Sequence, residues 1–301
     1  EHMKEGQKLG FDGRVVPAAE GKRLEKELEE KGVAFAYGFD LAEAIWTERP
    51  QFPCGKAWLL DESLAGKTVG EKLSEVREEM KKAGAESFLL TKLDDLMWLF
   101  NIRGCDVECN PVAISYGYIT EQEALLFIQE KALEEDVKEG LVRRGVEVRS
   151  YEEILPFLKE LPEGKKVLTD VRPCNYLLYK TLQEKQTTVE AKNPTEHLKA
   201  VKNPVELENM EKVYLQDSVA VTKFIYWLKT RIGKEEITEL SAADYLENLR
   251  RQIPGFLDLS FPTIAGYKEN AAMMHYEATK DHFAVLKPEG MLLVDSGGQY
   301  L

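Results

Sequence analysis

Two side chains near the C-terminal end of the sequence are of types that could do chemistry. His275 lies at the end of a predicted apolar strand, 271–276, and Asp295 follows the apolar run 291–294, twenty residues later. An imidazole can donate a hydrogen bond or exchange a proton near neutral pH. A carboxylate at a rigid strand end suits a hard divalent cation. On their own, such a histidine is more often a structural residue, and such an aspartate more often forms a turn.

Two further pairs of residues have a chemical interpretation and a structural one. Asp94 and Asp95 are adjacent carboxylates that could share acid and base roles. We prefer the structural interpretation, because acids at a helix start favour the N-terminal dipole and cap. Cys105 and Cys109 could form half of a metal site, but no second Cys or His pair follows them. Ordinary partly buried thiols are the structural alternative.

Composition limits the classes of protein to consider. The chain has 301 residues, of which 44% are hydrophobic and 31% charged, enough for two or three globular domains. A net charge of −13 argues against nucleic acid as the main partner. No sequence run approaches the roughly 18 apolar residues of a membrane span. Four cysteines are typical of reduced thiols. We therefore expect a cytoplasmic protein that binds neither nucleic acid nor membrane.

The elements that position these residues fall into three segments. Residues 1–60 contain a strand pattern in KLGFDGRVV, an amphipathic stretch near 18–31 and a second strand pattern in VAFAYGF. The stretch TERPQFPCGK then has the composition of a linker. A single βαβ unit cannot cover both faces of a parallel sheet. We therefore interpret residues 1–60 as the C-terminal remnant of a first domain.

Residues 61–194 alternate between helix and strand patterns, which predicts a complete α/β domain. Residues 68–83 have helical periodicity, and Gly84 is a natural C-cap. PVAISYGYI and EALLFI predict successive strands, joined as a hairpin across TEQ. Arg103 and Asp106 in NIRGCD are interpreted as structural residues.

Residues 195–301 have a different pattern. A long helix is predicted over 205–231, with Asn203 as its cap and Pro204 in its first turn. ITELSAADYLENLRRQ predicts a second helix. Strands are then predicted in LSFPTIAG, AAMMHY and MLLVDSGGQY. These strands have only begun to cover the two helices, so apolar positions of the long helix are expected to remain uncovered.

The order of these motifs resembles a known family. DLSFPTIAGYKENAAMMHY and LLVDSGGQY are similar to the catalytic domain of the Xaa-Pro aminopeptidases of the creatinase and prolidase superfamily. IWTERPQFPCG, DLMWLFNIRGCDVECNPVAISY, KNPVELENMEKVYLQDSVAV and ITELSAAD resemble matching stretches of the three-domain cytosolic type. The resemblance therefore covers almost the whole chain. It implies a creatinase-N-like middle domain followed by the opening portion of a "pita-bread" catalytic domain, in an α/β and α+β chain.

The resemblance also implies a chemistry. Members of the family hold two divalent metal ions, typically manganese, on two Asp, one His and two Glu. Asp295 matches the first of these aspartates, and His275 matches a histidine that lies beside the metals and stabilises the tetrahedral intermediate. The implied enzyme is a homodimeric metallo-aminopeptidase that cleaves the N-terminal residue from peptides with proline second.

The other metal ligands implied by the family fall beyond Leu301. We therefore interpret the chain as an internal fragment in which residues 195–301 are a truncated catalytic domain. The fragment is expected to be inactive and to bind no metal tightly. Two alternatives are a prolidase-type dipeptidase and a non-enzymatic module for protein binding or oligomerisation.

Overall fold

A computed structural model describes residues 3–43 and 45–301 of the chain. The chain divides into two compact units. The N-terminal unit contains the chain up to Glu62, together with Lys67–Asp106 and Val112–Lys202. The C-terminal unit contains Asn203–Leu301 and two short segments from the first half, Ser63–Gly66 and Val107–Pro111.

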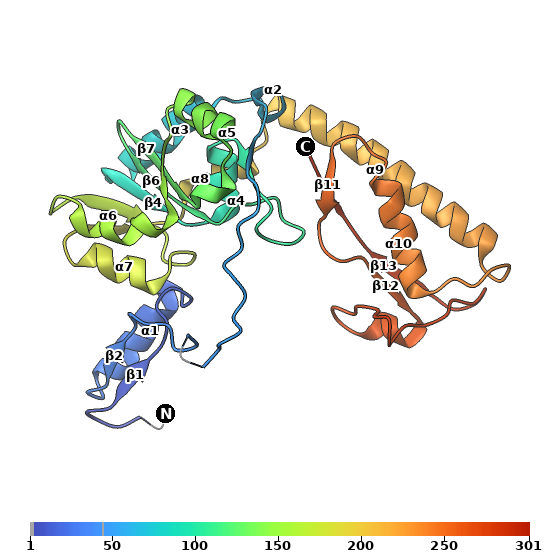
Figure 1. Cartoon of the computed structure of the whole chain (residues 1–301), viewed down its shortest axis with the longest axis horizontal. Helices are drawn as coiled ribbons and strands as arrows, with labels where there is room; N and C mark the ends of the chain where they lie inside the picture. The colour runs from blue at the N-terminus through green and yellow to red at the C-terminus, as the bar shows by residue number, and fades with distance from the viewer. Residues whose placement is uncertain (1–2, 44) are drawn as a thin grey trace. The chain divides into compact units, whose positions relative to one another are not determined.

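A six-stranded sheet forms the centre of the N-terminal unit (Figure 1). Its strand order is β10-β9-β4-β6-β7-β8. Only β6 runs against its neighbours, and its hairpin with β7 confirms the predicted pair of strands. The strands are β4 (Ser87–Leu90), β6 (Ser115–Thr120), β7 (Ala124–Ile128), β8 (Glu147–Ser150), β9 (Lys166–Thr169) and β10 (Thr187–Glu190).

Helices cover both faces of this sheet (Figure 1). Because successive side chains of a strand point to opposite faces, Phe88 and Leu90 join one hydrophobic cluster while Leu89 joins the other. The first cluster packs against α3 (Val69–Lys82), α4 (Leu93–Leu99) and α5 (Glu135–Arg143). The second packs against α6 (Ile154–Glu160) and α7 (Tyr176–Gln183). This layered arrangement is the α/β fold that the sequence predicted.

Local signals fix α3 as predicted. The Thr68 hydroxyl accepts a hydrogen bond from the backbone N–H of Glu71, and the Glu71 carboxylate accepts one from the backbone N–H of Thr68. This reciprocal capping satisfies two donors at the helix start. Gly84 follows the helix with φ +71, the left-handed conformation that favours glycine at a helix end.

The N-terminal segment forms the predicted βαβ unit. β1 (Lys8–Gly10) pairs in parallel with β2 (Ala34–Ala36), and α1 (Ala18–Glu29) connects them. α1 packs against α7, where a Cβ on Gly21 would lie 2.1 Å from Tyr176 Cδ2. Glycine is therefore required for this close helix contact.

Several short elements complete the N-terminal unit. The sequence patterns did not indicate β10 or α8 (Pro194–Ala200), which both follow α7. The remaining elements are β3 (Trp58–Leu59), which pairs with β5 (Ile102–Arg103), α2 (Glu62–Ala65), whose last residues belong to the C-terminal unit, and the 3-10 turns η1 (Glu130–Ala132) and η2 (Tyr151–Glu153).

Two helices open the main part of the C-terminal unit. α9 (Pro204–Arg231) begins as predicted, with the Asn203 side chain accepting hydrogen bonds from the first turn. α10 (Glu239–Arg250) begins after Thr238, whose hydroxyl accepts from the backbone N–H of Ser241. The two helices pack around Phe224, Ala242 and Leu246.

Two antiparallel strand pairs accompany these helices. β11 (Phe256–Leu259) pairs with β14 (Gly298–Tyr300), and β12 (Ile264–Tyr267) pairs with β13 (Leu292–Asp295). The predicted strand LSFPTIAG is thus divided, because Pro262 has no N–H to continue a ladder. The prediction of a strand in AAMMHY is wrong. That region forms the 3-10 turn η3 (Lys268–Ala272) and a following turn, where positive φ at Lys268 and His275 interrupts extended backbone.

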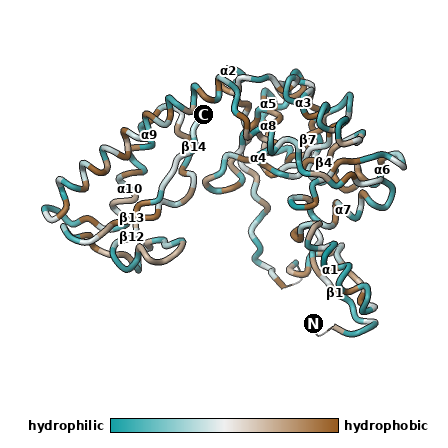
Figure 2. Tube along the Cα trace, turned by 180° about the vertical axis from the view of Figure 1, so that it is seen from behind, coloured by the Kyte–Doolittle hydropathy of each residue, from teal (hydrophilic) through white to brown (hydrophobic). Residues whose placement is uncertain are grey.

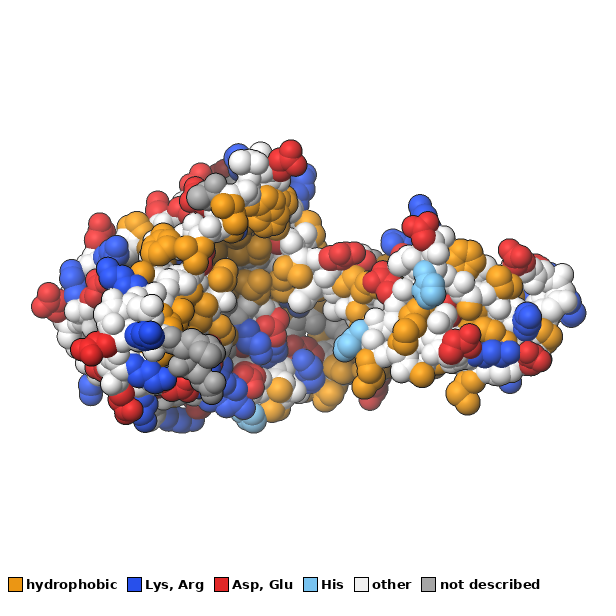
Figure 3. All heavy atoms as spheres, turned by 90° about the horizontal axis from the view of Figure 1, so that it is seen from below, with side chains coloured by type: hydrophobic (Ala, Val, Ile, Leu, Met, Phe, Trp, Pro, Cys, Tyr) orange, Lys and Arg blue, Asp and Glu red, His pale blue; other side chains and the backbone are white. Residues whose placement is uncertain are grey.

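Apolar side chains of α9 remain exposed, as predicted. Leu207, Leu215 and Ile225 are 50%, 69% and 46% exposed. Hydrophobic positions recur along the length of this helix (Figure 2), and apolar side chains stand between charged ones on the face of the C-terminal unit that Figure 3 draws. Among the described residues, no helix combines the length and apolar character needed to cross a membrane.

Candidate functional site

Asp295 is the last residue of β13 and lies beside an irregularity in a two-stranded ribbon. It pairs with Ile264 of β12, and the next contact along the ribbon is the backbone hydrogen bond from Ser260 N to Gly297 O at 3.0 Å. The pairing register shifts between these two contacts, in the stretch that contains Pro262. Such irregularities re-aim side chains and often lie next to active sites. Asp295 is exposed at this point.

The two glycines that follow Asp295 have steric reasons to be there. A Cβ on Gly297 would lie 2.9 Å from Ser260 Oγ, and one on Gly298 would lie 2.8 Å from the Tyr300 ring. Larger residues would push the two strands apart or displace Tyr300. The Ser-Gly-Gly motif thus allows β13 to continue closely into β14.

His275 occupies a turn after η3, not a strand. Its φ is +55, and it lies between Met274, which is 91% exposed, and Tyr276, which is 6% exposed. The His275 side chain is itself exposed. In the described parts of the chain, neither His275 nor Asp295 has a side-chain hydrogen bond or ion pair, so no such contact joins them.

The buried carboxylate of Glu239 organises the segment that carries His275, and no sequence motif had indicated this role. The carboxylate accepts hydrogen bonds from the backbone N–H groups of Tyr267 at 2.6 Å and Ala284 at 2.8 Å. It also accepts from Asn270 Nδ2 at 3.0 Å and Tyr276 Oη at 2.6 Å. An acid at the first position of a helix is ordinary, and only the fold brings these donors around it.

The pKa values of Glu239 and Tyr276 are both shifted by this arrangement. Burial opposes the charged form of Glu239, but hydrogen bonds from Tyr276 and the backbone of Tyr267 outweigh it and hold its pKa below the ordinary value. Burial and the neighbouring Glu239 carboxylate raise the pKa of Tyr276 to about 12. At neutral pH the contact is therefore a phenol donating to a carboxylate.

Asp295 fits the role of a metal ligand, but it is a single ligand. Its carboxylate is exposed, has no protein partner among the described residues and stands at a strand end, where its geometry is fixed. Over residues 3–43 and 45–301, no group of three or more His, Cys, Asp or Glu side chains could hold a metal ion. The described residues therefore provide part of a coordination shell at most.

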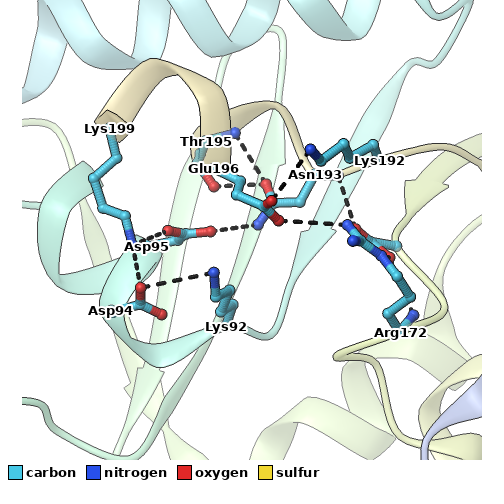
Figure 4. A network of polar contacts seen from close by, with 10 residues as sticks. Lys92, Asp94, Asp95, Arg172, Lys192, Asn193, Thr195, Glu196 and Lys199 are labelled. Atoms are coloured by element: carbon cyan, nitrogen blue, oxygen red, sulfur yellow. Dashed lines mark hydrogen bonds and ion pairs between the residues drawn. The ribbon is translucent and has the colours of Figure 1, made fainter. Parts of the chain in front are cut away.

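The adjacent acids Asp94 and Asp95 have a structural role. They lie in the first turn of α4, as predicted, and Lys199 Nζ contacts both carboxylates, at 2.7 Å from Asp95 Oδ1 (Figure 4). Asn193 Nδ2 donates to Asp95 Oδ2 at 2.6 Å, and Asp95 is fully buried. The pair thus ties α8 to α4 and is occupied by protein partners.

The residues of the NIRGCD motif also act within the fold. Arg103 Nη1 donates to the carbonyl oxygens of Met97 at 3.1 Å and Ile102 at 2.9 Å. The Asp106 carboxylate accepts from the backbone N–H groups of Gly55 and Ile114, at 2.5 Å and 2.7 Å. Both contacts confirm the structural interpretation.

The cysteines are free thiols. Cys54 and Cys105 are exposed, Cys109 is partly buried and Cys174 is buried. None of them belongs to a candidate metal cluster in the part of the chain that the structure describes. Cys109 is thus partly buried, as predicted for an ordinary thiol, whereas Cys105 is exposed and differs from that prediction.

Comparison with protein families defines the class of this chain. The creatinase/prolidase N-terminal domain matches residues 48–206, and metallopeptidase family M24 matches residues 208–301. The chain therefore belongs to the creatinase/prolidase N-terminal domain family. The residues after this domain match the start of an M24 metallopeptidase segment. This confirms the resemblance and the fold class predicted from the motifs.

Individual proteins are similar to this chain over almost its whole length. Probable Xaa-Pro aminopeptidase P from Pyrenophora tritici-repentis is 35% identical over 98% of this chain and 52% of its own length. The probable Xaa-Pro aminopeptidase P of Podospora anserina is 33% identical over 98% of this chain and 46% of its own. The crystal structure of the X-prolyl aminopeptidase of Caenorhabditis elegans, a cytosolic enzyme with a di-nuclear active site, matches 99% of this chain and 50% of that one, with a TM-score of 0.91 and 27% identity. The chain spans about half the length of these relatives.

Proposed function

We propose that a protein containing this chain and as long as its relatives is a metallo-aminopeptidase. It would release the N-terminal residue from peptides with proline in second position. The observation that carries the proposal is the likeness to the C. elegans X-prolyl aminopeptidase, which runs through 99% of the chain at a TM-score of 0.91. A match of this extent includes both the domain before the catalytic segment and the opening of the catalytic segment itself.

Asp295 is the proposed metal ligand in the present chain. Its exposed carboxylate at the end of β13, free of protein partners among the described residues, supports this role. Two divalent metal ions, manganese by the family resemblance, would polarise the scissile carbonyl and lower the pKa of a bound water. The di-nuclear active site of the C. elegans relative supports the number of metals.

His275 is proposed to donate a hydrogen bond to the substrate carbonyl oxygen. An imidazole N–H placed there strengthens its interaction as negative charge develops on that oxygen. The exposed side chain and the absence of an internal partner among the described residues support an outward-facing role. The constrained backbone at φ +55 supports a fixed orientation.

The domain division is also a proposal. The sequence patterns divide the chain into a first-domain remnant (1–60), a middle domain (61–194) and the opening of the catalytic domain (195–301). Because α8 belongs to the N-terminal unit, we place the second boundary after this helix. The start of α9 at Pro204, after the capping residue Asn203, supports a boundary shortly before this helix. A cytosolic location is supported by the description of the C. elegans relative. Homodimer formation rests on the family resemblance.

The test uses a chain extended to the length of the relatives and loaded with manganese. We expect it to hydrolyse an Xaa-Pro-Yaa tripeptide, and we expect Asp295→Asn to lose both activity and bound metal. Asp281→Asn is the matched control, because Asp281 is another exposed aspartate of the same unit. Hydrolysis of Xaa-Pro dipeptides alone would instead indicate a prolidase-type dipeptidase. A metal-free, inactive protein would indicate a binding module.

A further inference from the structure

The Glu239 carboxylate accepts hydrogen bonds from residues spread along the segment 267–284. Its donors come from Tyr267 at the end of β12, Asn270 in η3, Tyr276 and Ala284. Glu239 itself is fully buried at the first position of α10. One side chain therefore fixes the beginning, the middle and the end of the segment 267–284.

His275 lies between two of these anchoring points. Asn270 Nδ2 donates both to Glu239 and, at 3.0 Å, to Tyr276 Oη, which in turn donates to Glu239 Oε2. The three side chains thus form a closed triangle immediately before and after the turn that contains His275. Tyr276 is directly bonded to His275 in the chain, so its position determines where the histidine backbone can go.

The backbone at His275 needs such support. A φ of +55 is unfavourable for a residue with a side chain and persists only where the surroundings impose it. Met274 is 91% exposed, so packing of that neighbour does not impose the conformation. The hydrogen bond from Tyr276 to Glu239 is the side-chain contact on the other side of the turn.

The charge of Glu239 makes the anchor strong. Hydrogen bonds to an ionised acceptor are shorter and stronger than neutral ones, and the Tyr276 and Tyr267 contacts are both 2.6 Å long. The N-terminal end of α10 also favours a negative charge at this position. A Gln at position 239 would be neutral, and its NH2 group would face one of the N–H or O–H groups that now donate to the carboxylate.

We propose that Glu239 is a positioning residue for the reaction: through Asn270 and Tyr276 it fixes the backbone of His275 and so aims the imidazole at the substrate carbonyl. This inference rests on the proposed function of His275. Glu239 itself does not touch the substrate.

Kinetics of the manganese-loaded chain, extended to the length of its relatives, test the inference through a double-mutant cycle. We expect Tyr276→Phe, which removes one hydroxyl, to lower kcat about ten- to hundredfold, with little change in KM or metal content. In the His275→Ala background the same change should have less than about a twofold effect, because the residue to be positioned is absent. Glu239→Gln should behave in the same way. Equal effects of Tyr276→Phe in both backgrounds would overturn the inference.

A structural measurement separates this inference from the proposed function. In the 301-residue chain, Tyr276→Phe should change the NMR amide and Cα shifts of His275, which depend on φ. Tyr300→Phe is the matched control, because Tyr300 also donates at 2.6 Å to a carboxylate, that of Asp217; it should leave His275 unchanged. Unaltered His275 shifts in Tyr276→Phe would refute the positioning role. Normal activity of His275→Ala would instead refute the proposed function of His275.

Discussion

Arg250 and Asp217 join the two helices of the C-terminal unit through a two-point contact. Arg250 Nε lies 2.7 Å from Asp217 Oδ1, and Nη2 lies 3.1 Å from Oδ2. The Arg250 side chain is 1% exposed, and Tyr300 Oη donates to the same carboxylate. Asp217 of α9 therefore holds both α10 and β14.

Asp217→Ala should destabilise the C-terminal unit by about 3 kcal/mol, because it leaves the buried Arg250 charge without its partner. The unfolding of this unit can be followed by ¹⁹F NMR of fluorotryptophan at Trp227, which stacks on Tyr245 with ring centroids 4.0 Å apart. Glu208→Ala is the control, since Glu208 forms an exposed ion pair on the same helix; it should cost less than about 1 kcal/mol. Equal losses in the two variants would contradict the role of Asp217.

The Asp217 contact also predicts a dependence on pH. Burial disfavours the charged carboxylate, but hydrogen bonds from Arg250 and Tyr300 outweigh it and hold the pKa of Asp217 below its ordinary value. A lowered pKa in the folded state adds stability above the unfolded value of about 4, and this stability is lost as the pH falls through the folded pKa. The difference in stability between the native chain and Asp217→Asn should therefore be constant above about pH 5 and shrink below pH 4. A difference that grew on acidification would contradict this assignment.

Limited proteolysis tests the proposed middle domain. We expect early cuts by trypsin in the segment 47–56, which has no regular structure, and near 192–202, the connection to α9. Within that connection the exposed Lys202 should be cut before Lys199, whose side chain is held by Asp94 and Asp95. Early cleavage within 88–128, where the central strands lie, would contradict the domain assignment.

The same digestion tests the contact of the first segment. After cleavage in 47–56, the N-terminal piece should stay bound during gel filtration. The reason is that α1 packs closely on α7 at Gly21 and Tyr176, and Lys180 Nζ lies 3.0 Å from Glu25. Gly21→Leu should release the piece, because the side chain would overlap the Tyr176 ring. Glu134→Gln, which removes an exposed ion pair with Lys56 and keeps the trypsin site, is expected to leave the association unchanged.

Local signals predicted the elements that depend on neighbouring residues. The cap of α3 at Thr68 and the start of α9 at Asn203 each use side chains within three residues of the helix start. The hairpin of β6 and β7 likewise needs only a short turn between two apolar runs. Such features are encoded where they occur, so the sequence could indicate them.

Contacts between distant residues were not predictable in this way. Lys199 and Asp94 are separated by 105 residues, and their contact is what gives the acid pair its structural role. The apolar run before His275 resembled a strand, but Met273 and Met274 are exposed, and the segment follows the donors of Glu239. The motif resemblance identified His275 and Asp295 as candidates, whereas only the fold revealed Glu239.

Replacing His275 tests its proposed role directly. In the extended, manganese-loaded chain, His275→Ala should lose about 2 to 4 kcal/mol of transition-state stabilisation if the imidazole donates to the developing oxyanion. Metal content should stay near that of the native protein. His197→Ala, at an exposed histidine of α8, is the control and should keep full activity. If His275→Ala lost its metals, the residue would be a metal ligand and the proposed role would be wrong.

The last prediction concerns manganese binding by residues 1–301 alone. A divalent manganese site takes about six ligands, whereas the described residues contain no group of three candidate side chains. Asp295 can offer only its own carboxylate, and water would have to complete the shell. We therefore expect isothermal titration to show no micromolar affinity, and we expect no hydrolysis of an Xaa-Pro peptide. A chain extended to the length of the relatives should show both, and its Asp295→Asn variant should lose both. Measurable turnover by residues 1–301 would contradict the proposal that Asp295 is one part of a larger site.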